Sequence, residues 1–97
     1  MNSVQDAIYN WLTIRVVVDH RPEDHAAQET VEWFEKTLKE EHSLADFQYI
    51  KQDQWYFVNY YKESQQHELR FPVDLIEVML NQIQEFPERY NNFFDEE

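Results

Sequence analysis

The residues best suited to chemistry lie together in segment 19–25, which holds two histidines and three carboxylates. Imidazole and carboxylate groups bind divalent metals, and a metal with an open coordination position activates water. A metal-dependent enzyme or binder that uses His20, Asp24 and His25 is therefore one hypothesis. However, Pro22 interrupts any helix across this segment, so the side chains diverge, and their spacing matches no known metal motif. We favour no metal here, but a polar turn whose acids stabilise a helix N-terminus.

The other groups that catalysis would need are absent or isolated. The chain has no cysteine, which excludes thiol nucleophiles, and no glycine, which excludes the usual phosphate-binding loops and nucleophile elbows. His42 and His67 are isolated in the sequence, and Ser3, Ser43 and Ser64 fall at predicted caps or turns. We therefore expect neither catalysis nor a cofactor.

The charge balance excludes several classes of partner. The chain has 97 residues, with 20 acidic and 8 basic side chains and a formal net charge of -12. So few bases cannot neutralise phosphates, which argues against nucleic acids and anionic membranes as partners. No apolar run approaches the ~20 residues that span a bilayer, and no basic residue precedes Arg15 as a secretory signal requires. We expect one small cytoplasmic domain over residues 1–97.

Two helices are predicted before the middle of the chain. Ser3 is a suitable N-cap for a first helix over about residues 3–20, since apolar residues follow it at helical spacing. Residues 13–19 are rich in β-branched side chains, so a short helix followed by a strand remains the alternative. A second helix over about 23–41 follows Pro22.

The last part of the chain predicts a third helix and a tail. Pro72 opens this helix, its broad apolar face runs to Phe86, and Pro87 ends it. Residues 88–97 contain three aromatic side chains, so we expect this tail to pack back on the domain, with its acidic end frayed.

Three strands are predicted between the helices, over residues 47–51, 54–61 and 67–71. Their short connections suit an antiparallel meander. Without Asn-Gly or Asp-Gly, tight type I′ turns are unfavoured, so we expect hairpin loops built on type I turns. Asp53 is the residue expected to accept a left-handed conformation. The predicted fold is α+β with the order ααβββα, a three-stranded antiparallel sheet packed on one face by helices.

Both faces of the middle strand are apolar or amphipathic, so the sequence leaves the choice of inner face open. We expect the face that meets the helices to contain Trp55, Phe57, Phe47, Leu69 and Phe71. The opposite face then contains the predicted partner-binding residues Tyr56, Val58, Tyr60, Ile50 and Arg70, beside Gln48. Tyrosine is enriched at protein interfaces, so this face predicts an aromatic platform. The alternative is that the tail or the first helix covers it.

These observations predict a small interaction protein that binds another protein as a regulator, inhibitor or adaptor. Residues 46–70 carry four acids and three bases, so the negative charge lies on the helices, where it would steer a basic partner. The metal hypothesis is the first alternative, and mimicry of a nucleic acid towards a basic protein is the second. An open sheet edge also allows self-association into a homo-oligomer.

Overall fold

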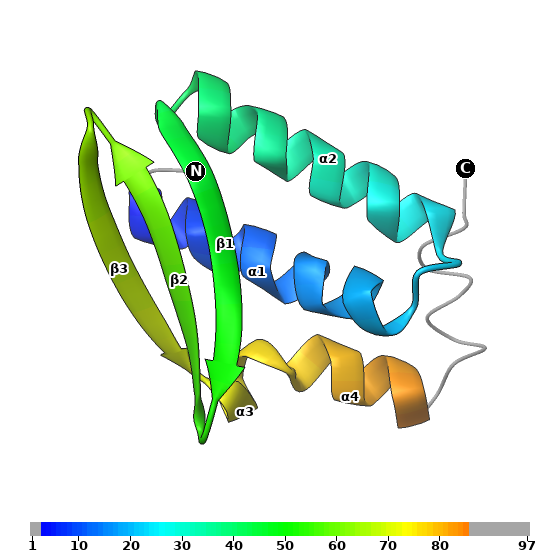
Figure 1. Cartoon of the computed structure of the whole chain (residues 1–97). Helices are drawn as coiled ribbons and strands as arrows, with labels where there is room; N and C mark the ends of the chain where they lie inside the picture. The colour runs from blue at the N-terminus through cyan, green and yellow to red at the C-terminus, as the bar shows by residue number, and fades with distance from the viewer. Residues whose placement is uncertain (1–2, 86–97) are drawn as a thin grey trace.

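The computed structural model of the chain describes residues 3–85. Figure 1 shows helices and strands in the predicted order, with the last helical segment divided in two. The elements are α1 (Val4–His20), α2 (His25–Glu40), β1 (Leu44–Gln52), β2 (Trp55–Lys62), β3 (Gln65–Pro72), α3 (Val73–Ile76) and α4 (Val78–Glu85).

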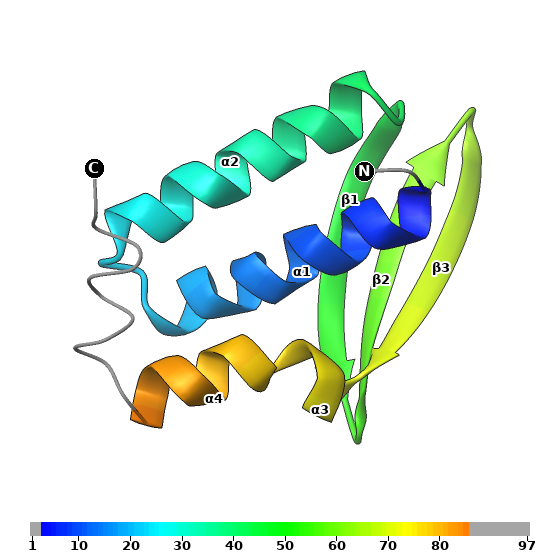
Figure 2. The ribbon, with the colours of Figure 1, turned by 180° about the vertical axis from the view of Figure 1, so that it is seen from behind.

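The three strands form one antiparallel sheet in the order β1-β2-β3, and the helices lie on one side of it. In both views α1 lies between α2 and α4 (Figures 1 and 2), and α1 contacts α2, α3 and α4. Within residues 3–85 no helix covers the other face of the sheet. The predicted α+β architecture, with helices on one face, is therefore confirmed.

Helix α1 is continuous, as the favoured prediction has it, and residues 13–19 are helical. Its N-cap is Ser3, whose side chain accepts a hydrogen bond from the backbone N–H of Asp6 at 3.0 Å. The β-branched residues do not form a strand because Ile14, Val16 and Val17 are all buried by neighbouring elements. Tertiary burial here outweighs the weak intrinsic preference of these residues for strands.

Helix α2 begins at His25 and not at about residue 23, because Asp24 is its N-cap residue and precedes the first helical turn. The Asp24 side chain accepts a hydrogen bond from the N–H of Ala27 at 3.0 Å. Ala27, Val31 and Leu38 are buried and form the predicted inner face of this helix.

The single helix predicted after Pro72 is divided at Glu77, which separates α3 from α4. The backbone of Glu77 leaves helical geometry, and its carboxylate reaches back to β1 and β2, where it accepts hydrogen bonds from Lys51 and Tyr56. The predicted helix end at Phe86 and Pro87 and the predicted packing of the tail 88–97 lie outside the described residues.

Both hairpins turn without glycine. Asp53 has a φ of 59° in the first turn, so the predicted left-handed conformation is confirmed. In the second turn Glu63 and Ser64 have φ angles of 55° and 68°. Positive φ at both central residues is typical of a type I′ turn and excludes a type I turn, so the expectation of a type I turn was wrong at the second hairpin. Lys62 and Gln65 on either side of this turn are register partners in the sheet, so the loop has only two residues.

The structure reverses the predicted faces of β2. Tyr56, Val58 and Tyr60 were predicted to be exposed, but they are 2%, 0% and 7% exposed and pack under the helices. Trp55 and Phe57, predicted to face the helices, alternate with them and lie on the other face. The predicted inner positions of β1 and β3, at Phe47, Leu69 and Phe71, are confirmed.

The register explains this correction. Residues directly opposite one another on paired strands share a face, and Phe57 lies opposite both Ile50 and Arg70. Burying the Phe57 face would therefore remove the Arg70 guanidinium and the Glu68 carboxylate from water, which is costly for unpaired charges. Ile50 and Arg70 do lie on the outer face, as predicted, but with Phe57 and not with Tyr56.

This assignment can be tested with two threonine variants, since threonine keeps the β-branched shape that suits a strand. Val58→Thr should lower the free energy of unfolding by about 2 kcal/mol, because it buries a hydroxyl group without a partner. Ile50→Thr, at a side chain that is 53% exposed, should change it by less than about 0.5 kcal/mol. Urea denaturation measures both, and equal losses would contradict the assignment.

The glycine-free second turn gives another prediction. Ser64→Gly should raise the free energy of unfolding by about 1 kcal/mol, because glycine adopts positive φ without the Cβ clash. The neighbouring Gln65→Gly is the matched control, since Gln65 lies in β3 and glycine should weaken the strand there. Thermal or urea unfolding that shows Ser64→Gly to be no more stable than wild type would argue against a strained turn.

Candidate functional site

The face of the sheet turned away from the helices is the first candidate site, which we call the open sheet face. Its side chains combine aromatic rings with amides and few charges. By strand alternation and register it contains Gln48, Ile50, Gln52, Trp55, Phe57, Asn59, Tyr61, Gln66, Glu68 and Arg70. Of the predicted partner-binding residues, only Ile50 and Arg70 lie on it, while Tyr56, Val58 and Tyr60 are in the core.

Large apolar and aromatic side chains lie at the centre of the open sheet face. Phe57 is half-buried between Ile50 and Arg70, and Tyr61 on the same strand is 41% exposed. The Arg70 guanidinium lies 4.6 Å from the centroid of the Trp55 ring, a cation–π contact. Among the strand residues that form this face, Arg70 is the only basic one, and the contact places its charge over an aromatic ring.

Carboxylates surround this apolar centre. Glu68 lies on the open sheet face, Asp53 and Glu63 lie in the turns at its two ends, and Asp46 lies in β1. All four side chains are exposed, and among the described residues none of them is in an ion pair. The face therefore offers an apolar middle with a negative rim.

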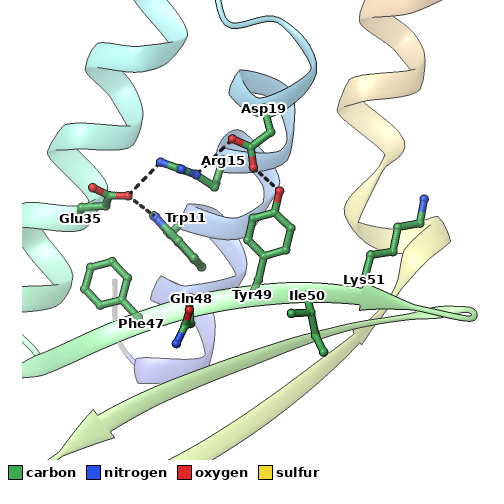
Figure 3. A pocket seen from close by; sticks show the side chains of 9 residues that line it. All are labelled: Trp11, Arg15, Asp19, Glu35, Phe47, Gln48, Tyr49, Ile50 and Lys51. Carbon is green, nitrogen blue, oxygen red and sulfur yellow. Dashed lines mark hydrogen bonds and ion pairs between the residues drawn. The ribbon is translucent and has the colours of Figure 1, made fainter.

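A second candidate lies on the helix side of β1, in a groove of about 570 Å³ that we call the β1 groove. Figure 3 shows α1 and α2 forming its upper wall and β1 forming its floor. Five consecutive residues of β1 line it, and Phe47 and Tyr49 point towards the helices while Gln48 and Ile50 point away. The lining residues are Trp11, Arg15, Asp19, Glu35, Phe47, Gln48, Tyr49, Ile50 and Lys51.

A polar network crosses the wall of the β1 groove. Arg15 lies between two carboxylates, with Nε 3.4 Å from Oδ1 of Asp19 and Nη1 3.6 Å from Oε2 of Glu35. The indole N–H of Trp11 donates to the same Oε2 of Glu35 at 3.1 Å (Figure 3). The Tyr49 hydroxyl donates to Asp19, and burial together with this hydrogen bond raises the pKa of Tyr49. The network carries one positive and two negative charges.

The β1 groove continues past its aromatic wall. The Trp11 ring packs edge-on against Phe47, with centroids 5.3 Å apart. Beyond Phe47 a second hollow of about 280 Å³ is lined by Glu35, Lys39, Asp46 and Phe47. Glu35 and Phe47 line both hollows, so the two are neighbours and together border β1 from Asp46 to Lys51.

At the other end, Lys51 connects the groove to α3. Its Nζ donates to Oε2 of Glu77 at 2.9 Å, and the Tyr56 hydroxyl donates to the same oxygen. Burial alone would raise the pKa of Glu77, but these two hydrogen bonds and the charge of Lys51 outweigh it and hold the pKa below its ordinary value. Glu77 is therefore a charged anchor between the sheet and the start of α4.

The proposed metal ligands do not converge. Nδ1 of His20 lies 3.0 Å from the carbonyl oxygen of Val16, Asp24 caps α2, and His25 is an exposed residue of its first turn. No group of three histidine or acidic side chains able to hold a metal ion occurs in residues 3–85. The segment is a polar helix–helix connection in which Asp24 caps the N-terminus of α2, as the favoured interpretation has it, and Oδ2 of Asp24 lies 3.8 Å from Nε of Arg21.

Sequence reasoning missed the β1 groove. The spacing of Glu35 and Lys39, four residues apart on one helix, favours an exposed ion pair, but the Glu35 carboxylate contacts Trp11 and Arg15. Trp11 belonged to the apolar stripe of α1, and its position in that stripe gave no sign of a polar contact. The available signal was Trp11 itself, since a buried indole N–H needs an acceptor.

Comparison with known proteins gives no relative from which function can be transferred. No protein-family model matches the chain, and no curated protein or solved structure is significantly similar to it. Across residues 3–85, no helix has both the length and the apolar character needed to cross a bilayer.

The Glu77 anchor predicts a specific pH dependence. Because its folded pKa lies below the ordinary value of 4.5, its stabilisation is complete above that pH and is lost as the pH falls through the folded pKa. The excess stability of wild type over Glu77→Gln should therefore be largest near neutral pH and shrink in acid. Urea unfolding at a series of pH values measures it, with Asp74→Asn as a control of equal charge change. A difference independent of pH would show that the charge of Glu77 does not act as the anchor.

Proposed function

We propose that this chain is a cytoplasmic protein–protein interaction module, which acts by binding another protein through the open sheet face and not by catalysis. The observation that carries the proposal is a group of large side chains, Ile50 opposite Phe57 and Tyr61 further along β2, which no described element covers. Large side chains on an uncovered sheet face are typical of interaction sites, and aromatic residues are enriched at the centres of protein interfaces.

The charges favour a partner of defined chemistry. The rim carboxylates of Asp46, Asp53, Glu63 and Glu68 are unpaired within the described residues, and the whole chain carries -12. A complementary surface therefore has an apolar projection surrounded by lysine or arginine. Attraction between the two surfaces raises the association rate, while burial of the aromatic centre supplies most of the affinity.

A second copy of this chain is a weaker candidate for the same face. Two molecules that each carry -12 repel one another, and packing the faces together would bring their rim carboxylates close. The proposal therefore commits to a different protein with a basic rim.

The test compares two variants of exposed or half-exposed aromatic residues. Phe57→Thr removes the centre of the open sheet face, whereas Trp33→Thr removes an aromatic side chain that is 59% exposed on α2, away from the sheet. Wild type and Trp33→Thr should retain a common basic protein in quantitative low-salt pull-downs, and Phe57→Thr should reduce its recovery at least about tenfold. Physiological salt should weaken all recoveries.

Two outcomes would overturn the proposal. If Phe57→Thr, shown to be folded by circular dichroism, retains every protein that wild type retains, the open sheet face is not the binding surface. If sedimentation shows that wild type is a dimer and Phe57→Thr a monomer, the face is an interface between copies of this chain.

A further inference from the structure

Strand β1 is an edge of the sheet, and its outer backbone groups have no partner among the described residues. It pairs with β2 in regular register from Gln48 to Gln52, and the strand order places nothing on its other side. No backbone hydrogen bond joins β1 to a described segment other than β2. In an antiparallel pair alternate residues direct both N–H and C=O away from the partner strand, so this stretch offers donors and acceptors in a row.

The β1 groove runs along this same edge. Its two hollows together follow β1 from Asp46 to Lys51, a run of about 17–20 Å in extended geometry. Hollows that follow one another along a strand edge suit an extended chain. The backbone of such a chain forms hydrogen bonds with the edge strand, and its alternate side chains enter the hollows. A compact ligand would leave most of this length uncovered.

We propose that the β1 edge binds an extended segment of a partner protein as a fourth strand, with a lysine or arginine of that segment placed against Glu35. The inference rests on the proposed function in that the partner is a protein, but it uses a different surface from the open sheet face. The partner segment pairs with Gln48–Gln52, and its alternate side chains lie between β1 and the two helices.

The preference for a basic side chain follows from the contacts of Glu35. Both its hydrogen bond with Trp11 and its ion pair with Arg15 use Oε2, so Oε1 is left for another donor (Figure 3). Glu35 lines both hollows, so a cation placed there is reached from either half of the groove. Arg15 is shared between Asp19 and Glu35, so these three groups keep one net negative charge. Of the other cations that line the hollows, Lys51 is in an ion pair with Glu77, and Lys39 lies beside the carboxylate of Asp46 in the lining of the second hollow.

The occupant could instead be a second copy of this chain, paired edge to edge through β1. Twofold pairing at this edge would place the Asp19 and Glu35 carboxylates of both copies along one seam. Each copy also carries a charge of -12, so an uncharged or acidic occupant gains less than a basic one. A basic extended segment is therefore favoured, and self-pairing becomes a defined outcome of the test.

The experiment selects binders from a library of random peptides about twelve residues long, using the full chain as bait. Selected peptides should be extended and enriched in lysine or arginine. Glu35→Gln keeps an acceptor for Trp11 but removes the charge, and it should weaken the best peptide at least about fivefold. Glu35→Lys should shift the selection towards acidic peptides. When the best peptide is titrated into the protein, the largest changes in backbone amide chemical shift should occur in residues 48–52.

Backbone pairing is tested on the peptide, which leaves the protein intact. Alternate backbone N–H groups of the bound peptide point towards β1, and the groups between them point to solvent. N-methylation of the first set removes the hydrogen bonds to β1 and should abolish binding, whereas N-methylation of the second set should be tolerated. Equal effects of methylating the two sets, or a selection that enriches no peptide above an unrelated bait, would overturn the inference. Protection of the β1 amides in a concentration-dependent dimer would overturn it in favour of self-pairing.

Phe57→Thr separates this inference from the proposed function. Peptide binding that survives Phe57→Thr but not Glu35→Gln belongs to the β1 edge, whatever the pull-downs show. Peptide binding lost in Phe57→Thr but kept in Glu35→Gln belongs to the open sheet face and would overturn the fourth-strand inference alone.

Discussion

Within residues 3–85 the helices cover only one face of the sheet, and the arrangement of the other described elements depends on this constraint. Helix α1 lies against the sheet between α2 and α4, and its buried side chains meet Tyr56, Val58 and Tyr60 in one core. The side chains on the alternate positions of the strands then lie on a face that no element of residues 3–85 covers. Both candidate surfaces follow from this arrangement. The open sheet face is the side without a described helix, and the β1 groove lies where α1 and α2 pack beside the edge of β1 that no described strand pairs with.

The sequence predicted the helices and the strands better than it predicted the faces. Helical spacing located α1 and α2, and even the β-branched end of α1 was assigned correctly because a long apolar run suits a helix buried on several sides. Alternation separated Trp55 and Phe57 from Tyr56 and Val58, but both groups are apolar, so alternation alone could not choose between them. The missing signal was on the neighbouring strands, where the partners of Phe57 and Asn59 include Arg70, Gln48 and Glu68.

The β1 groove could not be predicted in the same way, since it is made by residues far apart in the chain. Trp11 bonds to Glu35 across 24 positions, and Tyr49 bonds to Asp19 across 30. Periodicity describes each helix separately and contains no information on how α1 and α2 are placed over β1. Local patterns therefore assigned Glu35 to its own helix, and only the packing of three elements showed that its carboxylate faces a groove.

The bulge in β1 also limits how this molecule can polymerise. The register shifts between Ala45 and Gln48, where Asp46 adopts a φ of 54° and carries a charge inside an edge strand. At the opposite edge, β3 ends in Pro72, which has no N–H to offer. If β1 of one molecule paired with β3 of the next, the repeating contact would build an open filament, but the stretch of β1 in regular register is limited to Gln48–Gln52. Short, interrupted edges of this kind accept a single added strand while discouraging fibril growth.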